Sequence, residues 1–123
     1  FANRIRNAEF SLNGQTYHLE KNNKEHSIHG GTNGFNRQVF KTDTFYTVKD
    51  TAIVVFKYKS AHLEGGFPGN IELSIAYKLT NHNEIVLEYT ATTDKPTVVN
   101  FTNHSYFNLT GCTRNVLNHI YRI

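Results

Sequence analysis

Strict alternation of hydrophobic and polar residues is the main pattern along this chain. It is clearest in residues 71–79, where one face of a strand would carry Ile71, Leu73, Ile75, Tyr77 and Leu79. Residues 84–92 repeat the pattern. A period of two is typical of a half-buried β-strand, and the short link at residues 81–83 predicts that the two strands form an antiparallel hairpin.

Turn signals and β-branched and aromatic residues extend the sheet in both directions. Asn13-Gly14 is a strong hairpin turn signal, and Lys49-Asp50 marks a second turn. Further strands are expected at residues 8–12, 15–19, 38–48, 51–59, 97–103 and 116–123. Long loops are expected at 20–37 and 60–70, and long loops in compact β domains are often functional. With no sustained helical period, the pattern predicts one all-β, mainly antiparallel unit.

Composition narrows the classes of protein that fit. A chain of 123 residues suits a single domain. Its net charge of +3 comes from scattered lysines with no basic face, which argues against nucleic-acid binding. A lone cysteine, Cys112, excludes an internal disulfide. No signal peptide or spanning segment is recognisable, so we expect a cytoplasmic protein without a membrane partner. Because the chain starts at Phe1 and has no Met, we expect it to be processed or cut from something longer.

Candidate chemistry is concentrated just after the expected strand at residues 97–103. His104, Ser105 and Tyr106 follow Asn103 there, and a strand end holds side chains rigidly. A histidine titrates near neutrality, so His104 could exchange a proton at physiological pH. Residue types alone nevertheless favour a histidine held in a turn by local hydrogen bonds.

Two other polar segments could contact a ligand. His29 precedes Gly30-Gly31, where glycines permit close backbone approach, although an ordinary glycine-rich turn fits equally well. Arg4, beside Asn3, could offer a planar donor fork to hydroxyls or carboxylates, or lie on the surface. His26, His29 and His104 lack a recognised ligand spacing and have no cysteine or carboxylate partner, so we expect no metal site.

Carboxylates give little support to hydrolytic chemistry. Glu72, Glu84 and Glu88 fall on the polar faces of expected strands, and Glu64 has no second carboxylate to form a glycosidase-like pair. Sequons at Asn100, Asn103 and Asn108 are better explained by a polar pocket than by glycosylation. Amides and aromatic rings at strand ends suit a neutral sugar.

Taken in order, these segments resemble the aldose 1-epimerase (galactose mutarotase) family. The resemblance covers nearly the whole chain. It is carried by Phe1-Ala2-Asn3-Arg4-Ile5, Ser27-Ile28-His29-Gly30-Gly31, Gly34-Phe35, Gly66-Phe67-Pro68-Gly69-Asn70, Tyr77-Lys78-Leu79-Thr80, residues 91–97 and, most specifically, residues 100–109.

This resemblance implies a β-supersandwich protein that interconverts the α and β anomers of free galactose and glucose by opening the ring. His104 would correspond to the proton donor. Asn3, Arg4 and His29 would correspond to sugar-binding positions, with Ser105 and Tyr106 in the donor's binding segment. No metal or organic cofactor is implied.

The family's pattern is only partly present in this sequence. Its catalytic base is a Glu located well beyond the donor histidine, and no acidic residue here matches it. We therefore expect residues 1–123 to be one partial mutarotase-like domain, without the family's N-terminal strands and its C-terminal part, and to be nearly inactive alone. The alternatives are a non-catalytic carbohydrate-binding β domain and a structural β domain without a ligand.

Overall fold

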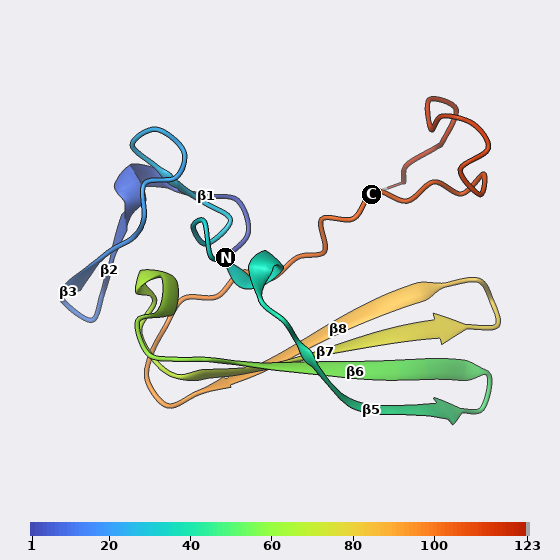
Figure 1. The fold of residues 1–123 in the computed structure, drawn as a ribbon, viewed down its shortest axis with the longest axis horizontal. Coiled ribbons are helices and arrows are strands. Elements are labelled where there is room, and N and C mark those ends of the chain that lie inside the picture. Colours follow the sequence, from blue (N-terminus) through green and yellow to red (C-terminus); the bar gives the residue numbers. More distant parts are fainter. Residues whose placement is uncertain (123) are drawn as a thin grey trace.

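A four-stranded antiparallel sheet forms the largest element of the computed structural model, which describes residues 1–122 (Figure 1). Its strands are arranged in chain order, β5 (Lys41–Val48), β6 (Thr51–Ser60), β7 (Ile71–Thr80) and β8 (Ile85–Thr93). The predicted β7–β8 hairpin and the turn at Lys49-Asp50 are confirmed. The first strand starts at Lys41 rather than at residue 38.

The register places the alternating apolar residues on one face of this sheet. Val54 is paired with Tyr77, and Tyr77 is paired with Leu87. Directly paired residues point to the same face, so the period of two read from the sequence becomes a continuous apolar surface across the strands. At the end of the sheet near Ile71, this surface forms the core, where Leu73 is 1% exposed.

Aromatic rings from outside the sheet cover the middle of the apolar face. Phe35 lies edge-on to Tyr58 with ring centroids 5.4 Å apart, and Phe40 lies 5.2 Å from the same ring. Phe101 stacks on Tyr89 at 6.0 Å and on Phe35 at 6.1 Å. Through these contacts the sheet anchors the loop after β4 and the segment after β8.

The far end of the same face remains uncovered. Phe45 is 80% exposed, Leu79 is 55% exposed and Ile85 is 52% exposed, although all three belong to the alternating pattern. The sequence predicts which side chains share a face, but it does not predict that this part of the face lacks a covering layer.

Two small antiparallel sheets lie beyond the other end of the main sheet (Figure 1). One pairs β2 (Glu9–Leu12) with β3 (Gln15–His18) around the predicted Asn13-Gly14 turn. The other, which was not predicted, pairs β1 (Arg4–Ile5) with β4 (Ser27–Ile28) inside the expected loop. The described residues also form three single-turn 3-10 helices, η1 (Arg6–Ala8), η2 (Phe35–Arg37) and η3 (Glu64–Gly66).

Two strand predictions were wrong. Residues 97–103 have no ladder partner; Asn100 instead exchanges two hydrogen bonds with Ala2, through its backbone carbonyl and its side-chain amide. Residues 116–122 form no strand either, because the His119 N–H donates to the Val116 carbonyl and closes a turn. Ile123 lies outside the described residues. Alternation alone cannot supply the neighbouring strand that a ladder requires.

The described part of the chain contains no α-helix and no helix long and apolar enough to cross a membrane.

Candidate functional site

An open hollow of about 710 Å³ lies where the start of the chain, the end of β4 and the segment after β8 meet. All six site residues predicted from the sequence line it, together with neighbours from the same three segments: Ala2, Asn3, Arg4, Ile28, His29, Asn100, Phe101, Thr102, Asn103, His104, Ser105 and Tyr106. The volume is in the range of small-molecule sites. A separate cavity beside Phe67 measures about 30 Å³ and has room for water but not for a sugar.

Asn3 and His29 hold each other by two hydrogen bonds. The Asn3 N–H donates to Nδ1 of His29 over 3.2 Å, and the His29 N–H donates to the Asn3 carbonyl over 3.0 Å. An Nδ1 atom that accepts a hydrogen bond carries no proton, so the neutral ring carries its proton on Nε2. His29 therefore offers an N–H donor from the opposite side of its ring.

The backbone at both residues is in the left-handed region. Asn3 has φ of 63° and His29 has φ of 53°. Positive φ is uncommon for residues other than glycine, but asparagine and histidine are both enriched there, so both residues tolerate this conformation. Crowding near His29 also explains why position 34 is a glycine, because a Cβ there would overlap the His29 carbonyl oxygen.

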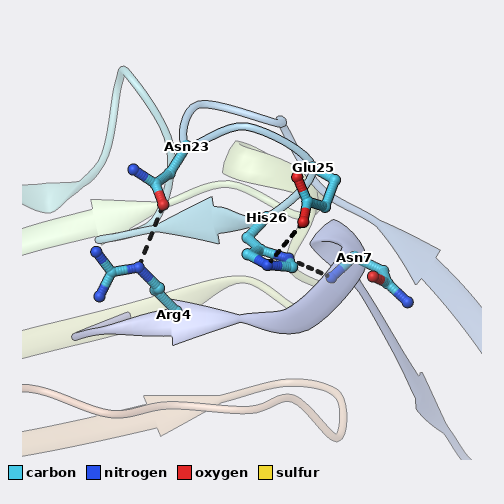
Figure 2. A network of polar contacts seen from close by, with 5 residues as sticks. All are labelled: Arg4, Asn7, Asn23, Glu25 and His26. Carbon is cyan, nitrogen blue, oxygen red and sulfur yellow. Dashed lines mark hydrogen bonds and ion pairs between the residues drawn. The ribbon is translucent and has the colours of Figure 1, made fainter.

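Arg4 lies on β1 beside the hollow. Its Nε donates to Oδ1 of Asn23 over 3.2 Å, as Figure 2 shows. Within residues 1–122, neither Nη nitrogen has a hydrogen bond or ion-pair partner. The guanidinium is thus fixed through one nitrogen and keeps four N–H donors for a ligand.

His104 reaches the hollow from the segment after β8. Its ring lies edge-on to His29, with centroids 5.3 Å apart and planes at 85°, and 5.6 Å from the ring of Tyr106. The turn that presents it is stabilised by the Ser105 N–H, which donates to Oδ1 of Asn103 over 2.9 Å. No described residue makes a hydrogen bond or ion pair with the His104 ring, so both ring nitrogens can serve a ligand.

The hollow is neutral to basic along its described lining. None of its described lining residues is a carboxylate, and Arg4 is its permanently charged group. Among residues 1–122, no group of three or more His, Cys, Asp or Glu side chains is arranged to hold a metal ion. The arrangement can donate hydrogen bonds to oxygen atoms and can transfer a proton at histidine.

Sequence reasoning missed the residues that hold these groups in place. Asn23 orients Arg4, Asn22 bonds to the backbone of Ile28, and Asn100 ties the His104 segment to Ala2. No period or motif signals such contacts, because each joins segments whose approach is decided by the fold.

Comparison with known proteins identifies the family. The sequence profile of the family Aldose 1-epimerase matches residues 1–123. The chain belongs to this family. It is 40% identical over 109 residues to an aldose 1-epimerase of Haemophilus influenzae and 41% identical over 109 residues to a maltose epimerase of Levilactobacillus brevis, matches that each cover 89% of the chain. The solved structure of galactose 1-epimerase from Lactobacillus acidophilus superimposes with a TM-score of 0.73 at 26% identity over 79% of the chain.

These matches cover much less of the other proteins. The chain spans 31% of the Haemophilus aldose 1-epimerase, 32% of the Levilactobacillus maltose epimerase and 29% of the Lactobacillus structure. The match of the family profile to the whole chain confirms the family inferred from the sequence, and the superposition on the Lactobacillus structure confirms the antiparallel all-β fold.

Proposed function

We propose that this chain carries the sugar-binding and proton-donating half of an aldose 1-epimerase, which interconverts the α and β anomers of free aldohexoses such as galactose and glucose. The hollow that brings Asn3, Arg4 and His29 to the ring of His104 carries this proposal. The names of the relatives support the reaction class, since they are aldose, galactose and maltose epimerases.

In the proposed reaction, His104 is the general acid. A carboxylate removes the proton from the anomeric hydroxyl, the bond between the anomeric carbon and the ring oxygen breaks, and protonated His104 gives its proton to that oxygen. The open aldehyde then rotates, and the same transfers in reverse close the ring on its other face. A positioned acid or base contributes about 10²- to 10⁴-fold to a rate.

Arg4, His29 and Asn3 would bind and orient the sugar. The Nε2–H of His29 and the Nη groups of Arg4 are donors, and donors suit the hydroxyl oxygens of a neutral sugar. Because the His29 and His104 rings are 5.3 Å apart, one hexose can contact both. Tyr106, which is 86% exposed, and Ser105 would contribute further contacts at the rim. The proposed reaction requires no metal or organic cofactor.

The catalytic base is proposed to lie outside these 123 residues. The described lining of the hollow has no carboxylate, and acid and base must act together on one sugar. Residues 1–123 would then be one part of a larger mutarotase domain, with little activity alone. A non-catalytic carbohydrate-binding domain is the second candidate, favoured by the same lack of a carboxylate in the described lining.

A chimera tests the proposal. This chain replaces the matching segment of the Haemophilus aldose 1-epimerase, and polarimetry follows the mutarotation of α-galactose and α-glucose. We expect the chimera to be active, the isolated chain to be nearly inactive, and His104→Gln in the chimera to lower kcat by at least about 10²-fold. His82→Gln, in the exposed β7–β8 turn, is the matched control.

Two outcomes would contradict parts of the proposal. If His104→Gln leaves the chimera's rate unchanged, His104 is not the acid. If a folded chimera binds galactose without accelerating its mutarotation, the non-catalytic alternative is favoured instead.

A further inference from the structure

Asn22 and Asn23 are adjacent in the loop between β3 and β4, and their side chains bond to two different walls of the hollow. Asn22 uses both ends of its amide on one residue: Nδ2 donates to the Ile28 carbonyl over 2.9 Å, and Oδ1 accepts from the Ile28 N–H over 2.8 Å. The Asn22 amide thus makes the pair of hydrogen bonds to Ile28 that the backbone of a neighbouring strand would otherwise make. Because Ile28 directly precedes His29, Asn22 fixes the point from which His29 enters the hollow.

Asn23 acts on the opposite strand. Its Oδ1 accepts from Nε of Arg4, and β1 carries Arg4 directly opposite Ile28 in the β1–β4 ladder. The asparagine pair therefore bonds to both members of one cross-strand pair, to the backbone of Ile28 and to the side chain of Arg4.

The backbone of Asn23 is itself restrained. It exchanges two hydrogen bonds with His26, at 3.1 and 3.0 Å, and Nδ1 of His26 accepts from the Asn7 N–H at 3.1 Å (Figure 2). Nε2 of His26 lies 3.2 Å from a carboxylate oxygen of Glu25. The loop thus contacts β1 and η1 at two places, Arg4 and Asn7, which limits how far Oδ1 of Asn23 can move.

We propose that Asn23 is a positioning residue that orients the Arg4 guanidinium for sugar binding, and that Asn22 does the same for His29. This inference rests on the proposed sugar site. Nε donates to no other described acceptor, so without Asn23 the guanidinium can rotate about its last side-chain bonds, and a sugar must then order it on binding. The residues act through Arg4 and His29, and need not touch the sugar.

Binding by the 123-residue chain itself tests the inference. Galactose is titrated into the ¹⁵N-labelled chain, amide shifts give Kd, and sorbitol at equal concentration controls for non-specific effects. We expect Asn23→Ala to weaken binding about fivefold, the usual value of one net hydrogen bond. Asn23→Asp keeps an acceptor oxygen and should restore Kd to within about twofold. Asn81→Ala, in the exposed turn after β7, should leave Kd unchanged.

A double-mutant cycle separates positioning from a general effect on the fold. In an Arg4→Ala background, Asn23→Ala should cause no further loss of affinity. Likewise, Asn22→Ala should have no effect once His29 is replaced by Ala. Proton exchange in the unmodified chain gives an independent test. The Arg4 Nε proton should exchange with water more slowly than the Arg37 Nε proton, because only the Arg4 Nε has a described acceptor.

The outcomes distinguish this inference from the proposed function. If only the chimera binds galactose, the same variants are compared in the chimera; if neither the unmodified chain nor the chimera binds it, the sugar site is refuted and the positioning role is lost with it. If the unmodified chain binds but Asn23→Ala binds equally well, only the positioning role is refuted. An equal loss from Asn23→Ala with and without Arg4 also refutes it, as does unprotected exchange of the Arg4 Nε proton.

Discussion

Phe101→Ala should release the His104 segment from the sheet. Residues 97–103 have no ladder partner. Close to His104, this segment is held by the paired hydrogen bonds between Asn100 and Ala2 and by the ring of Phe101, while the earlier residues Thr97 and Val98 are half-buried. That ring lies between Phe35 and Tyr89, stacked on both at interplanar angles of 17° and 13°.

The expected loss of stability follows from these contacts. Each stacked aromatic pair is worth about 1 kcal/mol beyond its buried area. Burial of the ring contributes about 1 kcal/mol more, because Phe101 is half-buried and a fully buried Phe gains about 1.5–3 kcal/mol. Phe101→Ala should therefore lower the free energy of unfolding by about 3 kcal/mol, within the range known for Phe→Ala changes.

Urea unfolding followed by tyrosine fluorescence measures this loss, and the galactose titration reports whether His104 still lines the hollow. Phe107→Ala is the matched control, because Phe107 is 48% exposed and makes no described aromatic pair; it should change stability by less than about 0.5 kcal/mol. A loss from Phe101→Ala as small as that of the control, or unchanged galactose affinity, would refute the view that this ring positions the segment.

Three further predictions concern packing and titration. Leu73→Ala should lower the free energy of unfolding by about 3–4 kcal/mol in urea melts, because Leu73 is fully buried, whereas Leu109→Ala, at an 84% exposed position, should change little. Burial among aromatic rings and the hydrogen bond to Glu64 raise the pKa of Tyr58 to about 12, and burial also raises the pKa of Tyr89; absorbance at 295 nm should show a late step near pH 12 that Tyr58→Phe removes. Because its folded pKa lies above the unfolded value of about 10, the stability from Tyr58 is complete below pH 10 and is lost as pH rises toward 12. Hydrogen bonds from Thr32, first from its hydroxyl and then from its N–H, lower the pKa of Glu20. The stability that the folded protein gains from this lowered pKa is therefore present above the pH range in which an unfolded Glu titrates, and is lost as pH falls through the folded pKa. Carboxyl NMR should show an unusually acidic Glu20, and Thr32→Val should return its pKa toward the ordinary value.

The sequence determined the strands that its alternation marks most clearly. Strands β7 and β8 and their shared apolar face follow from a period of two, because successive side chains in a strand must point to opposite faces. Strand β6 follows from its β-branched and aromatic residues and from the turn before it. The motif order also indicated the family and six of the residues that line the hollow.

Only the tertiary structure decided which extended segments pair. Residues 97–103 alternate as well as a strand does, yet their neighbour is the start of the chain, which offers a pair of bonds at Ala2 instead of a ladder. The short β1–β4 sheet had no visible pattern, because two residues are too few for a period.

The same distinction applies to the site. Residue types and order predicted that Arg4, His29 and His104 matter, but the 5.3 Å approach of the two histidine rings joins residues 75 positions apart. The roles of Asn22 and Asn23 depend on geometry alone, since an asparagine in a loop bonds to whatever the fold brings within about 3 Å. The sequence thus selected the chemical groups, and the packing of the loop against β1 decided how they are held.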